Sequence, residues 1–169
     1  MFKRTLMPSR ASAGDSMRAM NPQDGGATEW RKGAYTVSTD PDRLDLAAIH
    51  GYLRESYWAA GIPREKVEKA IRHSLPFGLY EESSLIGFAR VITDFATFAY
   101  VADVFVLPSH RGRGLGVWLM EVVRAHPDLQ KLRRWVLATR DAHELYRKTG
   151  FTEVDPGRFM QVLDPDVYR

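Results

Sequence analysis

The sequence predicts one α/β or α+β domain built on a mixed sheet with helices on both faces. Two observations predict it. Between residues 35 and 162, apolar positions follow strand periodicity in some segments and helical periodicity in others, in the order β-α-α-β-β-β-α-β-α-β-β. The three consecutive strands form a meander, and a strand-helix-strand crossover follows them. A length of 169 residues suits a single domain with one sizeable core.

A first strand and two helices precede the meander. The strand covers Tyr35–Ser38. Apolar residues at helical spacing predict an amphipathic helix over residues 42–57, and its apolar positions are Leu44, Leu46, Ile49, Leu53 and Tyr57. Gly61-Ile62-Pro63 then interrupts the chain. Because proline suits the start of a helix, Pro63 marks the beginning of a second helix over Arg64–His73.

Eight further segments complete the predicted fold. They are three meander strands, a helix, a buried strand, a short helix and the two strands of a closing hairpin, over residues 77–81, 85–93, 98–106, 112–125, 135–138, 141–148, 151–154 and 158–162. Asp141 and Glu144 have the spacing of a capping box for the short helix. Gly150 is expected to supply its C-terminal cap.

Residues 1–33 are predicted to be a disordered or loosely attached basic tail, and residues 34–169 to be the folded domain. No apolar period is sustained in the tail. It holds six basic and three acidic side chains, which accounts for the net charge of +3, so the folded part is neutral. Bulk charge therefore gives no argument for a nucleic-acid partner, and association through the arginine-rich tail is left as an alternative.

Composition excludes several other classes of protein. No run of about 18 apolar residues is present, so no membrane span is predicted. The chain has no cysteine, which excludes disulfides, thiolate metal sites and a cysteine nucleophile. A cytoplasmic location is expected. The histidines do not combine with carboxylates at a metal-binding spacing, and no metal is expected.

The segment Val104–Gly116 has the composition of a phosphate-binding loop. A strand ends at Val106, and three glycines then open the predicted helix, at Gly112, Gly114 and Gly116. The first N–H groups of a helix lack intrahelical partners and carry partial positive charge, and glycine lets the backbone approach phosphate oxygens. Two arginines in the loop, Arg111 and Arg113, can neutralise phosphate charge.

Two other phosphate-binding motifs do not fit this loop. A P-loop places Lys-Ser/Thr after its glycines, whereas Leu115-Gly116-Val117-Trp118 stands here. The dinucleotide fingerprint is G-x-G-x-x-G on the first strand of a βαβ unit. Here the spacing is G-x-G-x-G, and the loop follows a meander.

The loop resembles the signature of the GNAT family of N-acetyltransferases, which places Arg/Gln-x-x-Gly-x-Gly/Ala after a strand that ends in Val-x-Pro. The matching residues are Val106-Leu107-Pro108-Ser109-His110-Arg111-Gly112-Arg113-Gly114-Leu115-Gly116. A second motif of that family has an Asn, an Ala and a Tyr before Gly-Phe. It is similar to residues 139–151, where Ala142, Tyr146 and Gly150-Phe151 match and Thr139 replaces the Asn. The resemblance covers about residues 35–163.

The resemblance implies a mostly antiparallel central sheet of six to seven strands, in which a pair of central strands splays apart to admit acetyl-CoA. The pantetheine arm would pair with the last meander strand, and backbone N–H groups of the loop would hold the pyrophosphate. The implied donor-binding residues are Val104, Phe105, Val106, Arg111, Gly112, Arg113, Gly114, Leu115, Gly116 and Thr139. Threonine at position 139 can still offer a hydroxyl to the pantetheine.

Direct acetyl transfer to an amine requires proton removal from the amine, polarisation of the carbonyl and protonation of the leaving thiolate. Tyr146 matches the family's tyrosine acid. A phenol with a pKa of about 10 keeps its proton at neutral pH and can pass it to the thiolate. Packing on the CoA side of the core without titration is the alternative for Tyr146. A backbone N–H near Phe105 or Val106 would polarise the carbonyl. Asp103 is a candidate general base. A purely structural role for Asp103, and Asp94 as the base, are alternatives.

Three residues are expected to border the acceptor site, because the first helices and the meander form that side in the family: Tyr57, Trp58 and Arg90. Core packing is the alternative for the two aromatic residues. The resemblance thus implies acetyl-CoA-dependent N-acetylation of a primary amine by direct transfer in a ternary complex, with a small molecule favoured over a protein. A non-catalytic acyl-CoA sensor is the alternative. Many family members form dimers, so a homodimer is compatible with the resemblance.

Overall fold

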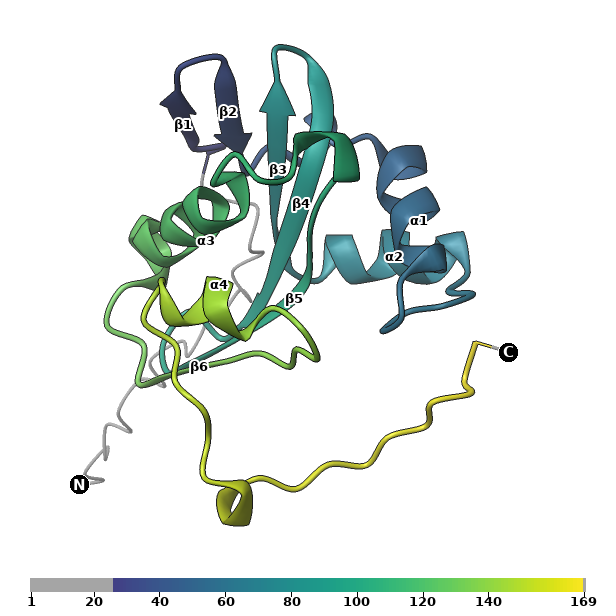
Figure 1. Cartoon of the computed structure of the whole chain (residues 1–169), viewed down its shortest axis with the longest axis vertical. Coiled ribbons are helices and arrows are strands. Elements are labelled where there is room, and N and C mark those ends of the chain that lie inside the picture. The colour runs from purple at the N-terminus through teal and green to yellow at the C-terminus, as the bar shows by residue number, and fades with distance from the viewer. Residues whose placement is uncertain (1–25, 169) are drawn as a thin grey trace, which may run out of the picture.

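The computed structural model describes residues 26–168, which form one six-stranded sheet in the order β1-β2-β3-β4-β5-β6 (Figure 1). The strands are β1 (Glu29–Lys32), β2 (Tyr35–Ser38), β3 (Leu75–Glu81), β4 (Ser84–Thr93), β5 (Phe98–Val106) and β6 (Arg134–Val136). Neighbouring strands are antiparallel except for β5 and β6, which are parallel. The predicted mixed, mostly antiparallel sheet is therefore confirmed.

Helices cover both faces of the sheet, as predicted. The α-helices of the described chain are α1 (Leu46–Glu55), α2 (Arg64–Arg72), α3 (Leu115–Ala125) and α4 (His143–Arg147). Short 3-10 turns occupy Pro41–Arg43, Pro108–His110, Pro127–Leu129 and Pro156–Arg158. The pair α1 and α2 lies on one face, and α3 and α4 lie on the other (Figure 1). Within residues 26–168, no helix has the length and apolar character needed to cross a bilayer.

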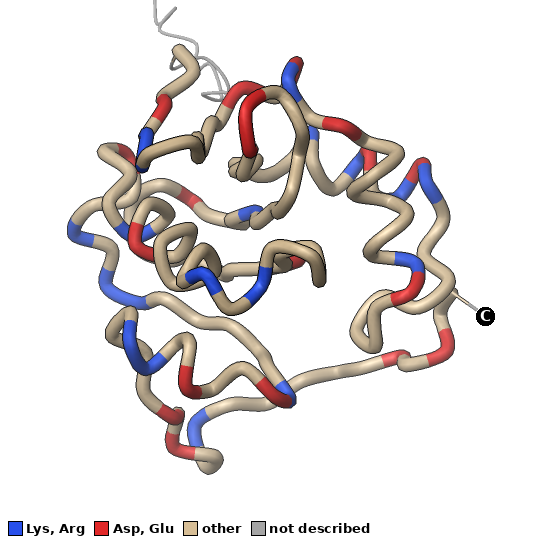
Figure 2. Tube along the Cα trace, turned by 45° about the horizontal axis from the view of Figure 1, so that its top comes forward, with Lys and Arg blue, Asp and Glu red and all other residues tan. Residues whose placement is uncertain are grey.

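Each face of the sheet carries its own apolar core. The helical spacing of α3 buries one stripe of side chains against the sheet: Leu115, Trp118, Leu119, Val122 and Val123. On the other face α1 and α2 bury Ile49, Leu53, Val67 and Ile71 against Phe88 and Phe105. Burying one such side chain contributes about 1.5–3 kcal/mol. Figure 2 shows acidic and basic residues interspersed along the chain rather than grouped by sign.

The strand β5 stays paired with β4 as far as Val106 but parts from β6 after Tyr100. Its register against β4 shifts between the pairs Phe88–Phe105 and Arg90–Ala102, and Asp103 in this irregularity has a φ of 55°. Extra residues in a bulge bend the strand. Pairing with β6 ends at Tyr100 and Val136. The edge of β5 that faces β6 therefore has no strand beside it beyond Tyr100, which is the predicted splay.

The last residues of the predicted tail belong to the sheet. Glu29–Lys32 form β1, which pairs with β2, so a tail reaching residue 33 is wrong for these four residues. The strand β1 is not evident from the sequence because Trp30 is the only large apolar residue in it. Its ring lies 6.4 Å from that of Phe77. Residues 1–25 of the predicted tail lie outside the described residues.

The predicted closing hairpin is also wrong. Residues 151–154 and 158–162 form no strands, and the sheet ends at β6. Asp155 accepts a hydrogen bond from the Gly157 N–H (3.0 Å), which starts a turn at Pro156–Arg158. The chain then crosses beneath the sheet toward α1 and α2 (Figure 1). Met160 and Val162 are fully exposed on this path, so their strand-like pattern does not mark a buried strand.

Candidate active site

A groove of about 710 Å³ opens where β5 leaves β6. Its walls are the end of β5, the loop that leads into α3, the segment after α1 and the segment that leads into α4. The residues predicted to bind the donor that line it are Val104, Phe105, Val106, Arg111, Gly112, Gly114, Leu115 and Gly116. Arg113 and Thr139 do not line this groove.

The glycine loop presents an uncapped helix N-terminus to the groove. Gly112 and Gly114 have φ values of 75° and 73°, in the left-handed region that favours glycine. A Cβ at either position would meet no atom within 4 Å, so it would project into open space. Gly114 is the N-cap of α3 and has no side chain to accept from the first N–H groups of that helix. The loop therefore fits an incoming anion.

Gly116 has a different role from the other two glycines. A Cβ at this position would lie 2.8 Å from the Leu145 side chain on α4. The glycine therefore allows α3 and α4 to approach closely. This contact helps to place α4, and with it Tyr146, beside the loop.

Both arginines of the loop form hydrogen bonds with other residues of the chain. Arg111 donates from Nε to the Val106 carbonyl (3.0 Å) and from Nη2 to the Tyr52 hydroxyl (2.8 Å). Arg113 donates to the Tyr35 hydroxyl (3.1 Å) and lies 3.8 Å from a Glu81 oxygen. Arg111 is therefore part of the groove wall. The guanidinium of Arg113 is directed to β2 and β3, which places it poorly for the phosphate contact expected of it.

Tyr146 lies on α4, where the groove meets two smaller cavities. Its side chain is buried, and its ring packs edge-on against Phe151 with centroids 5.9 Å apart. Burial raises the pKa of Tyr146 from 10.0 to about 12, and the nearby Tyr57, Asp141 and Tyr100 add to the shift. The phenol is therefore neutral throughout the physiological range.

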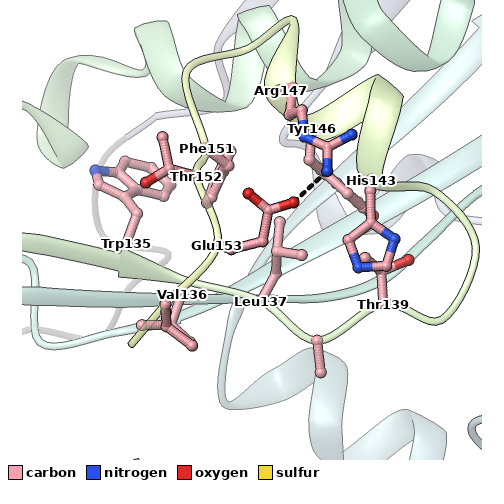
Figure 3. Close-up of a pocket in the computed structure, with 12 residues that line it drawn as sticks. Trp135, Val136, Leu137, Thr139, His143, Tyr146, Arg147, Phe151, Thr152 and Glu153 are labelled. Carbon is pink, nitrogen blue, oxygen red and sulfur yellow. Dashed lines mark hydrogen bonds and ion pairs between the residues drawn. The ribbon is translucent and has the colours of Figure 1, made fainter. Parts of the chain in front are cut away.

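One of the two smaller cavities, of about 310 Å³, lies between β6 with its continuation, α4 and residues 151–154 (Figure 3). The ion pair between Arg147 and Glu153 borders it. Tyr146 and Thr139 are the predicted site residues among those that line it. No residue of the glycine loop lines this cavity. The cavity is therefore a poorer candidate for the donor-binding site than the groove.

The other cavity, a pocket of about 300 Å³, shares Val104 and Tyr146 with the groove and contains the predicted acceptor residues Tyr57, Trp58 and Arg90. Asp103 also lines this pocket. The Trp58 Nε1–H donates to Asp103 Oδ1 (3.2 Å), and the Arg90 Nε–H donates to Oδ2 (2.5 Å). The candidate base Asp103 is thus engaged through both oxygens and links three predicted residues into one cluster.

Asp94, the alternative base, lies in the turn between β4 and β5 and borders neither the groove nor the pocket. Its carboxylate accepts from the Thr97 hydroxyl and from the N–H groups of Thr97, Ala96 and Phe98. These bonds hold the pKa of Asp94 well below its usual range. The position is that of a turn residue.

The capping residue of α4 differs from the prediction. Thr139 Oγ1 accepts from the Ala142 N–H (3.0 Å), whereas Ala142 is the N-cap and Asp141 makes no capping bond. The capping box predicted for Asp141 and Glu144 is therefore wrong, because the helix begins two residues later than its sequence pattern indicates. The predicted C-terminal cap is confirmed, since Gly150 has a φ of 90° and donates to the Arg147 carbonyl (3.1 Å).

Several wall residues were not predicted from the sequence. Tyr52 stacks on Phe105 with ring centroids 3.9 Å apart, and Tyr100 and Tyr168 line the acceptor-side pocket. A Cβ at Gly61 would lie 3.0 Å from the Tyr168 carbonyl oxygen, so the end of the described chain rests against the α1–α2 connection. No local pattern reveals such long-range contacts. Residues 26–168 contain no cluster of His, Asp and Glu suited to a metal ion.

Known proteins are similar to this chain in both sequence and fold. A family model described as the acetyltransferase (GNAT) domain matches residues 72–153. A protein of Gibberella zeae that is named as an acetyltransferase is 36% identical over 140 residues, which cover 70% of this chain and 79% of that protein.

Two solved structures extend the comparison. A GNAT-family protein from Xanthomonas campestris pv. campestris is 51% identical, with a TM-score of 0.77 over 79% of this chain and 96% of that one. An acetyltransferase-fold protein from Clostridium acetobutylicum, solved with acetyl-CoA, is 15% identical. Its TM-score is 0.57 over 76% of this chain and 94% of its own, and it shows the shared fold alone. The glycine loop, the parted strands and these relatives together establish that the chain belongs to the GNAT acetyltransferase family.

Proposed function

We propose that this chain is an N-acetyltransferase that moves the acetyl group of acetyl-CoA to the primary amine of a small molecule, by direct transfer with both substrates bound. One observation carries the proposal. The uncapped start of α3, the unpaired edge of β5 at Val104–Val106 and Tyr146 all border a single groove. The Clostridium acetobutylicum structure, which contains acetyl-CoA, supports the choice of donor.

In this proposal the backbone N–H groups of the loop and of the first turn of α3 hold the donor's pyrophosphate. The pantetheine arm lies along the edge of β5 and exchanges main-chain hydrogen bonds as an added strand does. A backbone N–H near Phe105 or Val106 polarises the acetyl carbonyl. Arg111 adds positive charge to the groove wall, and Thr139 acts on the donor only indirectly, through its hydrogen bond to the Ala142 N–H before α4.

Tyr146 acts as a hydrogen-bond donor to the leaving sulfur. A thiol such as that of CoA ionises near a pKa of about 8.5, whereas burial raises the pKa of Tyr146 to about 12. Complete proton transfer from this phenol to the thiolate is therefore uphill by several pKa units. The hydroxyl instead stabilises the departing thiolate through a charge-assisted hydrogen bond, and solvent completes its protonation.

The acceptor-side pocket favours a small amine over a protein. Its volume is about 300 Å³, and aromatic side chains form much of its wall, including Tyr57, Trp58 and Tyr100. The Arg90–Asp103 ion pair at its base is internally neutral. Such a pocket suits an amine with an apolar or aromatic body.

The test is turnover by the full chain. Acetyl-CoA is mixed with a panel of small primary amines, the released CoA thiol is measured, and mass spectrometry identifies the product. We expect thiol release above the enzyme-free rate for at least one amine, with an equal amount of its acetylated form. Acetyl-CoA binding without turnover of any amine would favour the sensor alternative. Absence of binding would contradict both functions.

A further inference from the structure

Two carboxylates border the acceptor-side pocket, and their surroundings differ. Asp103 accepts from Arg90 and Trp58. Asp141 lines both the pocket and the donor groove, and no hydrogen bond or ion pair joins its carboxylate to another described residue. Asp141 therefore stands, without an ion-pair partner among the described residues, where the two substrate spaces meet.

The segment before α4 is fixed in place, which gives Asp141 a defined position. The backbone N–H of Arg140 donates to the Tyr57 hydroxyl (3.0 Å), and the Arg140 guanidinium lies 3.9 Å from the centre of the Tyr57 ring. Thr139 Oγ1 accepts from the Ala142 N–H on the other side. No side chain caps α4, and no described backbone N–H donates to the Asp141 carboxylate.

Asp141 also lies near the group that faces the leaving thiolate. After burial and Tyr57, its negative charge is among the causes that raise the pKa of Tyr146. The two side chains line the same groove and the same pocket. A carboxylate here therefore lies within electrostatic range of the atoms that react.

The chemistry of amine attack creates a need for such a carboxylate. When the nitrogen bonds to the acetyl carbon, it becomes positively charged while still carrying its protons. A nearby anion stabilises this charge in the transition state more than in the neutral bound amine, which is the condition for catalysis. A carboxylate whose oxygens already accept hydrogen bonds from Arg90 and Trp58, as those of Asp103 do, is less suited to the task.

We propose that Asp141 is the catalytic carboxylate that faces the attacking amine and accepts its proton; this inference rests on the proposed function. The N–C bond forms as the C–S bond breaks, and the sulfur leaves with the electron pair of that bond. One proton passes from nitrogen to Asp141 and then to solvent, and the thiolate gains one proton from solvent. The amine and acetyl-CoA thus become the acetylated amine and CoA thiol, with no other reactant.

The experiment compares Asp141→Asn with wild type, using two kinds of nucleophile. One is whichever of benzylamine, ethanolamine and cadaverine wild type acetylates fastest. The other is hydroxylamine, a much weaker base whose adduct sheds its proton without help. General-base loss lowers rates by about 100-fold or more. We expect such a loss in kcat with the alkylamine, a loss at least tenfold smaller with hydroxylamine, and unchanged affinity for acetyl-CoA.

Glu144→Gln is the matched control. Glu144 is an exposed carboxylate on α4 that pairs with Arg147 and lines neither cavity, so its variant should keep the wild-type rates. Equal losses of Asp141→Asn with both nucleophiles, or no loss, would overturn the assignment of Asp141 while leaving the proposed function intact. Failure of wild type to acetylate any of the nucleophiles would overturn the proposed function and this inference with it.

Discussion

Burial determines the chemistry that Tyr146 can perform. The pKa of this phenol lies at about 12 because desolvation disfavours the phenolate. A general acid works best when its pKa lies near the working pH. Tyr146 is therefore better suited to donating a hydrogen bond than to releasing its proton, and it keeps that proton at any pH at which the fold is expected to work.

Replacing Tyr146 by Phe removes the donor and little else. A hydrogen bond to a charged group contributes about 1.5–3 kcal/mol, so we expect kcat to fall by about 10- to 100-fold with unchanged affinity for acetyl-CoA. In wild type, kcat should show no falling limb between pH 7 and 10, since Tyr146 loses its proton only near pH 12. Steady-state kinetics over this range measure both effects. Tyr80→Phe, at a residue that lines neither the groove nor the two cavities, is the control, and an equal loss there would contradict a specific role for Tyr146.

The hydroxyl of Tyr80, unlike that of Tyr146, borders no cavity of the proposed site and makes no hydrogen bond with a described residue. Its oxygen is buried without a hydrogen-bond partner among the described residues, and its ring lies under the Arg43 guanidinium. An unsatisfied buried polar group costs about 1–3 kcal/mol. Tyr80→Phe should therefore raise the free energy of unfolding by about 1 kcal/mol in denaturant titrations. Tyr35→Phe, which removes an acceptor for Arg113, should not stabilise the chain; stabilisation by both or neither would contradict this account.

The loop before α3 combines two demands on glycine in one element. Left-handed backbone at Gly112 and Gly114 directs the chain into the helix, and the space beside both residues is open. Close approach to Leu145 explains Gly116. The spacing G-x-G-x-G thus reflects backbone conformation at two positions and helix packing at the third.

Gly114→Ala tests whether the open space beside the loop is the donor site. Left-handed backbone costs an alanine about 1–2 kcal/mol, and the same cost applies to Gly33→Ala in the β1–β2 turn, where φ is 59° and space is also open. We expect similar losses of stability in both variants. Calorimetry should find acetyl-CoA affinity at least about tenfold weaker in Gly114→Ala alone, equal to roughly 1.4 kcal/mol. Equal affinities would place the donor elsewhere.

Elements with a strong apolar period could be predicted from the sequence. The stripe from Leu115 to Val123 locates α3, and the meander strands follow from their apolar runs. Weak or misleading patterns caused the errors. The strand β1 has one large apolar residue, and the apolar residues after Arg158 are exposed because the Asp155 turn directs the chain away from the sheet.

The site shows the same division between local and long-range signals. Glycine positions and Tyr146 stand in local motifs, so the sequence identifies them. The partners of Arg113 and Asp103 depend on contacts with distant segments, such as Tyr35 and Trp58. The capping box predicted from spacing placed Asp141 at the start of a helix, whereas α4 begins at His143 and has no side-chain cap.

At the scale of the whole molecule, the parting of β5 from β6 organises the proposed function. The donor groove lies beyond the last β5–β6 pair, and the acceptor-side pocket adjoins it at Val104 and Tyr146. Helices from the two faces of the sheet meet at this opening. One sheet therefore brings both proposed substrate spaces to the side chains that are proposed to be catalytic.

Hydrogen–deuterium exchange with and without acetyl-CoA tests the central claim most directly, because it reports both binding and its place. We expect slower exchange in residues 104–106 and 111–117, whose N–H groups are proposed to bind the donor, and unchanged exchange in the β1–β2 hairpin. Protection that is absent at saturating acetyl-CoA, or confined to the cavity beside Glu153, would contradict it.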